Sequence, residues 1–200
     1  YGSQEYHLRW FLLNKKNGVN IENISDKMNG FQIAGPNSRK LLQKVTNFSL
    51  EDFKFRDAHT ILVGNISCLV QRVSYTGDLG FEIYCSPNKQ CDLWEVLWSA
   101  GAEFDIKPFG MRAMMSLRLD KFFGSWLSEF SPDYTPAETG LDKFINFKKD
   151  YDFIGRSAAY AEHINGCERK LCIFEVDADD ADVVGYEPIS LGNKVVGFCT

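Results

Sequence analysis

Apolar and polar positions alternate in the middle of the chain, which predicts a run of antiparallel strands. Residues 60–63 and 66–75 are two such stretches, separated by Gly64-Asn65, and residues 81–85 resume the alternation. Period-two alternation places one side of each strand against a core and the other side outward. We therefore predict a three-stranded meander, whose last two strands form a hairpin around a five-residue loop at 76–80.

Glu82 lies on the last strand of this meander, on the face opposite Phe81 and Ile83. Two interpretations are open. A carboxylate there can lie on the solvated face of a half-buried sheet. It can also line a binding site, because Tyr75 and Tyr84 add aromatic surface beside it. A carboxylate so placed suits a flat heterocycle whose adjacent N–H groups donate a bidentate pair of hydrogen bonds.

The remaining patterns predict helices and further strands on both sides of the meander. Helices are expected over residues 1–13, after the Gly35-Pro36 break, over 88–100 and 111–122, and within 152–163. Strands are expected over residues 19–24, 30–35, 141–147, 168–176 and 195–199. The prediction is an α+β fold of antiparallel sheets with flanking helices, including a central split β-α-β-type unit. Asn165-Gly166 suggests a domain boundary, with one region over 1–165 and the start of another, rich in strands, over 166–200.

Composition and charge exclude several classes of partner. The chain has 200 residues, 44% of them hydrophobic, enough for one sizeable core. Its 27 acidic and 22 basic side chains give a net charge of -5, which repels phosphate backbones, so we expect no nucleic-acid partner. No run is long enough to span a membrane and no signal peptide opens the chain, so we expect no membrane partner.

The possible metal ligands are scattered. The six cysteines include no C-x-x-C pair and the three histidines are far apart, so neither zinc nor an iron–sulfur cluster is expected. Free thiols indicate a reducing compartment, the cytoplasm or, in a eukaryote, the mitochondrial matrix. The acidic run 177–182 lacks the glycine and glutamate of a calcium loop and is expected to be a solvated loop.

Arg112 falls in the first turn of the helix predicted over 111–122. The dipole of a helix disfavours a cation at that end. The arginine is therefore either a surface residue or one that reaches a ligand.

Motifs over most of the chain resemble those of one enzyme family. RVSYTGDLGFEIY at 72–84 is similar to the R-x-x-Y-T-G-E-x-G-[FWY]-E-[IL]-Y segment of folate-binding aminomethyltransferases. That family includes the T-protein of the glycine cleavage system and the C-terminal folate halves of dimethylglycine and sarcosine dehydrogenases. Further blocks follow in the family's order: FQIAGP at 31–36, FGMRA at 109–113, SLRLDK at 116–121, YTPAE at 134–138 and DFIGR at 152–156. Segments DAD at 180–182, EPI at 187–189 and VVG at 195–197 resemble the dehydrogenase branch.

The resemblance implies a fold and a chemistry. The family has three domains around a central hole that receives tetrahydrofolate, and this chain would hold part of the first, the second and the start of a β-barrel-like third. The implied enzyme transfers the carbon of an N-methyl amine, as an iminium or formaldehyde equivalent, to the N5 and N10 nitrogens of tetrahydrofolate. An upstream flavin domain, carrying FAD, would oxidise the amine. Glu82 would hold the pterin edge, Tyr75 would border it, and Arg112 would contact the folate.

The resemblance places the family's catalytic aspartate upstream of Tyr1, and no residue here occupies its motif. We therefore expect no catalytic residue in this chain and no turnover by these 200 residues alone. Two alternatives of other classes remain. One is a non-catalytic folate-binding or iron–sulfur-maturation module, although the K-G-C-Y-x-G-Q-E motif of that branch is replaced by KDYDFIGR at 149–156. The other is a structural or docking segment.

Overall fold

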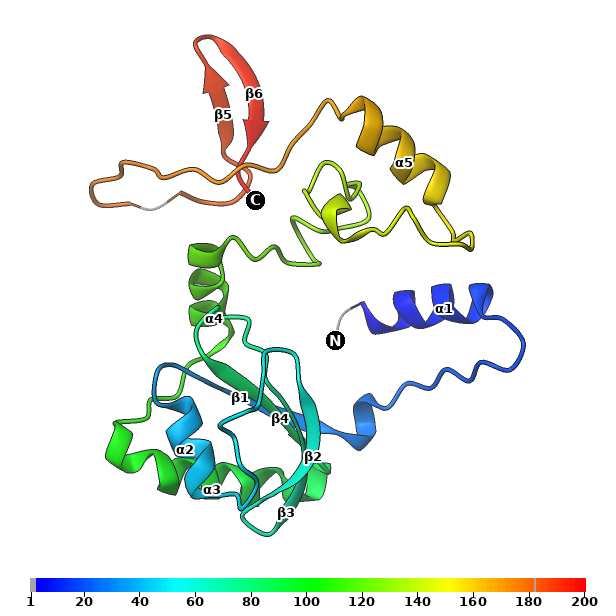
Figure 1. Ribbon diagram of the computed structural model, residues 1–200. Helices are drawn as coiled ribbons and strands as arrows, with labels where there is room; N and C mark the ends of the chain where they lie inside the picture. The colour runs from blue at the N-terminus through cyan, green and yellow to red at the C-terminus, as the bar shows by residue number, and fades with distance from the viewer. Residues whose placement is uncertain (1–2, 182) are drawn as a thin grey trace. The chain divides into compact units, whose positions relative to one another are not determined.

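The computed structural model describes residues 3–181 and 183–200, which form two compact units (Figure 1). Unit 1 extends to Lys121, and unit 2 begins at Phe122. The elements of unit 1 are α1 (Gln4–Asn14), β1 (Asn29–Ala34), α2 (Ser38–Lys44), β2 (Ala58–Val63), β3 (Ile66–Gln71), β4 (Gly80–Cys85), α3 (Gln90–Gly101) and α4 (Met111–Leu117). The elements of unit 2 are α5 (Arg156–Asn165), β5 (Pro188–Leu191) and β6 (Lys194–Phe198).

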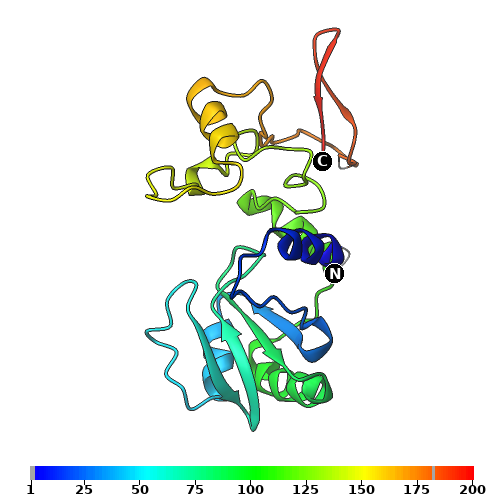
Figure 2. The same ribbon diagram turned by 90° about the vertical axis from the view of Figure 1, so that its right-hand side faces the viewer.

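Unit 1 is built on a four-stranded antiparallel sheet with the order β1-β4-β3-β2. β2 and β3 form a hairpin in which Val63 is opposite Ile66, so Gly64-Asn65 is the connection, and the predicted meander is confirmed. β1 pairs with β4 although the two strands are far apart in sequence, with Ile33 opposite Phe81. α3 packs beside β1, as Figure 2 shows from the side.

One face of this sheet and the helices α2 and α3 enclose the core. Phe81 and Ile83 of β4, Leu42 of α2 and Leu93 of α3 are completely buried. The buried strand residues share one face, because the register sets Ile33 opposite Phe81 and Val70 opposite Ile83. A run of alternating apolar residues on each strand builds such a face. The core residues are Ile33, Leu41, Leu42, Leu50, Phe53, Ile61, Val63, Ile66, Cys68, Val70, Phe81, Ile83, Cys85, Leu93 and Leu97.

The end of β3 differs from the prediction. The strand ends at Gln71 rather than at residue 75, so the β3–β4 connection runs over residues 72–79 rather than 76–80. The backbone of Arg72 is used elsewhere: its N–H donates to the Asp57 carbonyl at 2.9 Å and its carbonyl accepts from the Arg56 N–H at 3.0 Å. Since these groups are already paired, they cannot extend the ladder to β4.

Three predicted strands are wrong. Residues 19–24, 141–147 and 168–176 form no strand in the structure. The alternation is present in the sequence, but a strand is stable only beside a partner. The turn at Asp142–Phe144 instead follows Gly140, which has a φ of 70°, and Phe144 is 76% exposed.

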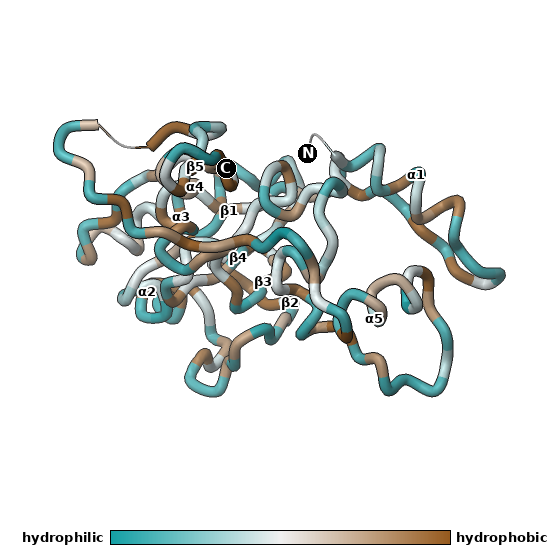
Figure 3. Tube along the Cα trace, turned by 90° about the horizontal axis from the view of Figure 1, so that it is seen from above, coloured by the Kyte–Doolittle hydropathy of each residue, from teal (hydrophilic) through white to brown (hydrophobic). Residues whose placement is uncertain are grey.

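The predicted helices form, with shifted ends. The first is Gln4–Asn14, and residues 1 and 2 lie outside the described part of the chain, as does Asp182 of the predicted acidic loop. The fourth ends at Leu117, followed by a short 3-10 turn at Leu119–Lys121. α1 buries none of its side chains, and both hydrophilic and hydrophobic residues lie along it, with the hydrophobic run Phe11 to Leu13 near its end (Figure 3).

The predicted α+β class is confirmed, since helices flank antiparallel sheets. In unit 2, β5 and β6 form a two-stranded antiparallel hairpin with an irregularity between Ile189 and Ser190. A β-barrel-like domain beginning at residue 166, and the boundary before it, stay predictions.

An ion pair ties two segments of unit 2 together. Arg169 Nε donates to Glu138 Oε1 at 2.7 Å, and the Leu171 N–H donates to the Glu138 carbonyl at 2.8 Å. Thr135 closes the loop, because its N–H donates to Glu138 Oε2 at 2.9 Å. The hydrogen bond from Arg169, followed by that from Thr135, lowers the pKa of the Glu138 carboxyl.

We expect Ile83→Ala to lower the free energy of unfolding by about 2–5 kcal/mol, because it leaves a cavity in the core at the centre of the sheet. Leu62→Ala is the matched control: Leu62 lies in the same sheet and is 58% exposed, so its truncation should cost less than about 1 kcal/mol. Urea unfolding followed by circular dichroism measures both. Equal losses would show that the buried face is not the core.

We expect acid to weaken the segment pairing around Glu138. Its pKa is lower in the folded state, so its stabilising contribution is present above the unfolded value of about 4.3 and is lost as the pH falls through the folded pKa. Arg169→Met should therefore flatten part of the decline in thermal midpoint between about pH 5 and pH 3. Lys170→Met, at an exposed neighbouring position, is the control. An unchanged pH profile in Arg169→Met would contradict the assignment.

Candidate functional site

Three polar side chains form a row across the face of the sheet that points away from the core. Glu82 of β4 lies opposite Gln32 of β1 on one side and Gln71 of β3 on the other. All three are partly exposed. Directly opposite residues on neighbouring strands have Cβ atoms about 4.5–5.5 Å apart, so one carboxylate is flanked by two amides.

Tyr84 fixes one oxygen of this carboxylate. Its hydroxyl donates to Glu82 Oε2 at 2.6 Å. Among the described residues, Glu82 Oε1 has no hydrogen-bond partner. Burial, and then the hydrogen bond and charge of Glu82, raise the pKa of the Tyr84 phenol. The phenol is therefore a donor at neutral pH, and the second carboxylate oxygen is available to a ligand.

Hydroxyl groups order the loop that follows β3. Gln32 Nε2 donates to Ser74 Oγ at 3.0 Å, and Ser74 Oγ is 2.8 Å from Thr76 Oγ1. Thr76 is buried. Tyr75, half-buried, lies between these two anchored residues. The network thus links the row of polar residues to the loop that carries Tyr75.

Arg112 is the second residue of α4 and is exposed. In the described part of the chain, its guanidinium makes no hydrogen bond or ion pair. The helix begins after Gly110 without a side-chain cap. A cation at this end of a helix gains nothing from the helix dipole, so Arg112 is available to an anionic or polar partner.

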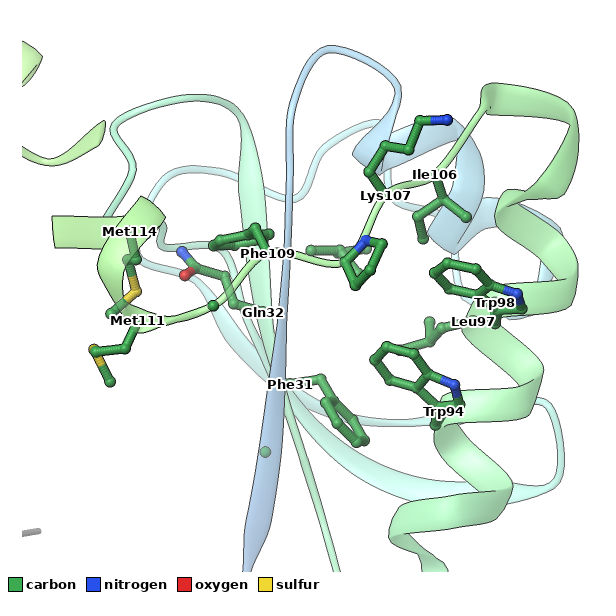
Figure 4. A pocket seen from close by; sticks show the side chains of 14 residues that line it. Phe31, Gln32, Trp94, Leu97, Trp98, Ile106, Lys107, Phe109, Met111 and Met114 are labelled. Atoms are coloured by element: carbon green, nitrogen blue, oxygen red, sulfur yellow. The ribbon is translucent and has the colours of Figure 1, made fainter. Parts of the chain in front are cut away.

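A cavity of about 370 Å³ connects β1 with the first turn of α4. Gly30 to Ile33, Trp94, Trp98 and residues 106–111 line it, together with Leu97 and Met114. Figure 4 shows Met111 and Phe109 beside Gln32, with Trp94 and Trp98 on the far side. The two tryptophan rings are stacked, with centroids 5.4 Å apart. The walls of the cavity are mostly apolar.

The three sequence-predicted site residues lie on three different elements of unit 1, namely the β3–β4 loop, β4 and α4. Tyr75, Glu82 and Arg112 do not line the cavity themselves. Gln32 lies near all three residues. It is opposite Glu82 in the register and donates a hydrogen bond to Ser74, the neighbour of Tyr75. It also lines the cavity together with Met111, the neighbour of Arg112.

Several residues of this site escape sequence reasoning. Gln32 lies in the 31–36 block, and Ser74 and Thr76 lie in the 72–84 segment, but neither these residues nor Gly30 are predicted to have a role in the site. The alternation within residues 30–35 does place Gln32 opposite the apolar face, which is the one local signal. The pairing of β1 with β4 is non-local and could not be read from it.

No three His, Cys, Asp or Glu side chains gather in a metal-binding arrangement within residues 3–181 and 183–200. None of the helices described is long and apolar enough to cross a membrane.

Comparison with protein families matches residues 1–149 to the model of the GCVT N-terminal domain. The chain belongs to this family. The resemblance found in the sequence motifs is thereby confirmed.

Individual proteins similar to this chain agree with the family assignment. The whole chain is 39% identical to the mitochondrial dimethylglycine dehydrogenase of Homo sapiens, of which it spans 24%. It is 36% identical to the aminomethyltransferase of Caldanaerobacter subterraneus, with 91% of this chain and 48% of that protein covered. The chain therefore spans about a quarter to a half of the length of these members of the family.

Among solved structures, the heterotetrameric sarcosine oxidase from Corynebacterium sp. U-96, in complex with pyrrole 2-carboxylate, matches half of this chain and 51% of its own. The TM-score is 0.42 and the sequence identity 20%.

Proposed function

We propose that this chain is the tetrahydrofolate-binding part of a one-carbon transferase, in a protein of the dimethylglycine or sarcosine dehydrogenase type. The observation that carries the proposal is the Glu82 carboxylate, held by Tyr84 on the outward face of the sheet with one oxygen unengaged. Membership of the GCVT N-terminal domain family supports it. Similarity over the whole chain to a mitochondrial dimethylglycine dehydrogenase supports the dehydrogenase branch.

The donor set of a pterin fits this carboxylate. A pterin presents a ring N–H and an amino group side by side, and a carboxylate accepts such a pair in parallel. Tyr84 occupies one lone pair of Oε2. Each carboxylate oxygen has two lone pairs, so Oε2 can accept a second hydrogen bond while Oε1 accepts the other.

The remaining residues suit other parts of the folate. Tyr75 would border the pterin with its ring, since the hydroxyls of Ser74 and Thr76 hold its loop beside the polar row. Arg112 would contact the folate from the start of α4, where its guanidinium is free of partners in the described chain.

The chemistry is a carbon transfer. Tetrahydrofolate supplies the two nitrogens that accept the carbon of an N-methyl amine, delivered as an iminium or formaldehyde equivalent. The residues of this chain bind and orient, which lowers the entropic part of the barrier. We place no catalytic residue among them. An FAD-carrying domain of the same protein would generate the iminium, in the mitochondrial matrix of a eukaryote or in the cytoplasm of a bacterium.

We expect Glu82→Gln to weaken tetrahydrofolate binding by about 2–4 kcal/mol, because the amide keeps the shape but replaces one acceptor with a donor. Glu95→Gln, on the exposed side of α3, is the matched control and should bind normally. Titration calorimetry on the intact protein measures both affinities. Unchanged affinity in a folded Glu82→Gln variant would remove Glu82 from the site and with it the proposed function.

We expect Arg112→Ala to weaken folate binding by about 1–3 kcal/mol, while the free energy of unfolding shifts by less than about 1 kcal/mol. The side chain is exposed, so its loss leaves no cavity. Arg9→Ala, at an exposed position in α1, controls for the loss of one positive charge. A large loss of stability with normal affinity would make Arg112 a structural residue.

A further inference from the structure

We propose that Tyr84 is a positioning residue that orients the Glu82 carboxylate for its ligand, and that Gly30 is glycine because the Tyr84 ring occupies the space of a side chain there. The inference rests on the proposed role of Glu82 in folate binding. It adds two residues to the site, one on β4 and one on β1.

The first observation is the position of Tyr84 along the strand. Glu82 and Tyr84 are two residues apart on β4 and share its outward face. Two residues of a strand span about 6.6 Å, which a side chain as long as tyrosine bridges when it leans along the strand. The phenol oxygen reaches Glu82 Oε2 at 2.6 Å. A hydrogen bond to an ionised acceptor is short and strong, so it selects one orientation of the carboxylate.

The second observation is the close approach of the ring to β1. Gly30 is directly opposite Tyr84 in the register. A Cβ at Gly30 would lie 2.7 Å from Tyr84 Cδ1 and 2.9 Å from Cε1, closer than real Cβ atoms come. The φ of Gly30 is not in the left-handed region, so space and not backbone conformation requires the glycine. A glycine inside a strand often marks such an approach.

The neighbour on the other side of the ring is large. Leu69 of β3 is the second register partner of Tyr84. With a leucine on one side and no side chain on the other, the ring has room only over β1. The position of the ring therefore depends on Gly30 of β1 and Leu69 of β3, the two register partners of Tyr84 on β4.

The consequence is a preorganised carboxylate. A glutamate side chain that nothing holds in place loses rotamer freedom when it binds a ligand, and that loss reduces affinity. Tyr84 imposes the orientation before the ligand arrives, and leaves Oε1 open. The raised pKa of the phenol is consistent with a donor that stays protonated.

The test is a double-mutant cycle on tetrahydrofolate affinity in the intact protein. Tyr84→Phe removes only the hydroxyl, and Gly30→Ala displaces the ring. Each should weaken binding by about two- to twelvefold, the cost of ordering one glutamate side chain when the ligand binds. In a Glu82→Gln background, neither should cause a comparable further loss, since the orientation of a carboxylate no longer matters.

Two variants control for the substitutions themselves. Tyr160→Phe alters a tyrosine of unit 2 that packs against Phe147. Gly197→Ala alters a strand glycine with open space around it. Both should bind tetrahydrofolate normally, and the unfolding midpoint reports whether every variant is folded. If Gly30→Ala does not fold, Tyr84→Phe, which changes no backbone position, carries the test.

The outcomes separate this inference from the proposed function. If Glu82→Gln weakens binding but Tyr84→Phe does not, the positioning role is wrong and the folate site stands. If Tyr84→Phe weakens binding equally in both backgrounds, Tyr84 acts independently of Glu82 and the inference is overturned. If Glu82→Gln itself has no effect, both fail.

Discussion

The pairing of β1 with β4 is the constraint on which the rest of unit 1 depends. It joins residues about fifty positions apart and sets Ile33 opposite Phe81 on the core face. The same register sets Gln32 opposite Glu82 and Gly30 opposite Tyr84 on the outward face. A slip of one residue would turn every β1 side chain to the other face of the sheet. The core and the candidate site are therefore specified by one set of backbone hydrogen bonds, and a change that shifts the register would damage both.

The two faces of β4 show how one strand serves stability and recognition. Phe81 and Ile83 are completely buried, and burial of such side chains stabilises the fold by about 1.5–3 kcal/mol each. The alternate residues Glu82 and Tyr84 are half-buried and hold a charge on the outward face. Gly30 lowers the stability of β1 but leaves space for the Tyr84 ring. A glycine inside a strand costs about 0.5–1 kcal/mol relative to alanine, and this cost is tolerated where a ring must lie close to the backbone.

Local patterns predicted the parts of the fold that depend on local sequence. The β2–β3 hairpin, the outward position of Glu82 and α3 with its apolar stripe follow from periodicity and turn residues. Residues 19–24, 141–147 and 168–176 have the same alternation, but no neighbouring strand pairs with them. Of the candidate site, Glu82 and Gln32 could each be placed on a face of a strand from sequence alone. The positions of Gln32 beside Glu82 and of Gly30 beside Tyr84 could not, because they come from the pairing of β1 with β4. The loop of Tyr75 likewise depends on a hydroxyl contact with β1.

The central claim is that the outward face of β4 binds the pterin of tetrahydrofolate through Glu82. A crystal structure of the intact protein with tetrahydrofolate tests it most directly. We predict that the ring N–H and the amino group of the pterin lie about 2.7–3.2 Å from the two oxygens of Glu82, with the Tyr84 hydroxyl still bonded to Oε2. A pterin ordered elsewhere, for example against Trp94 and Trp98 in the cavity beside β1, with Glu82 facing solvent, would contradict the account.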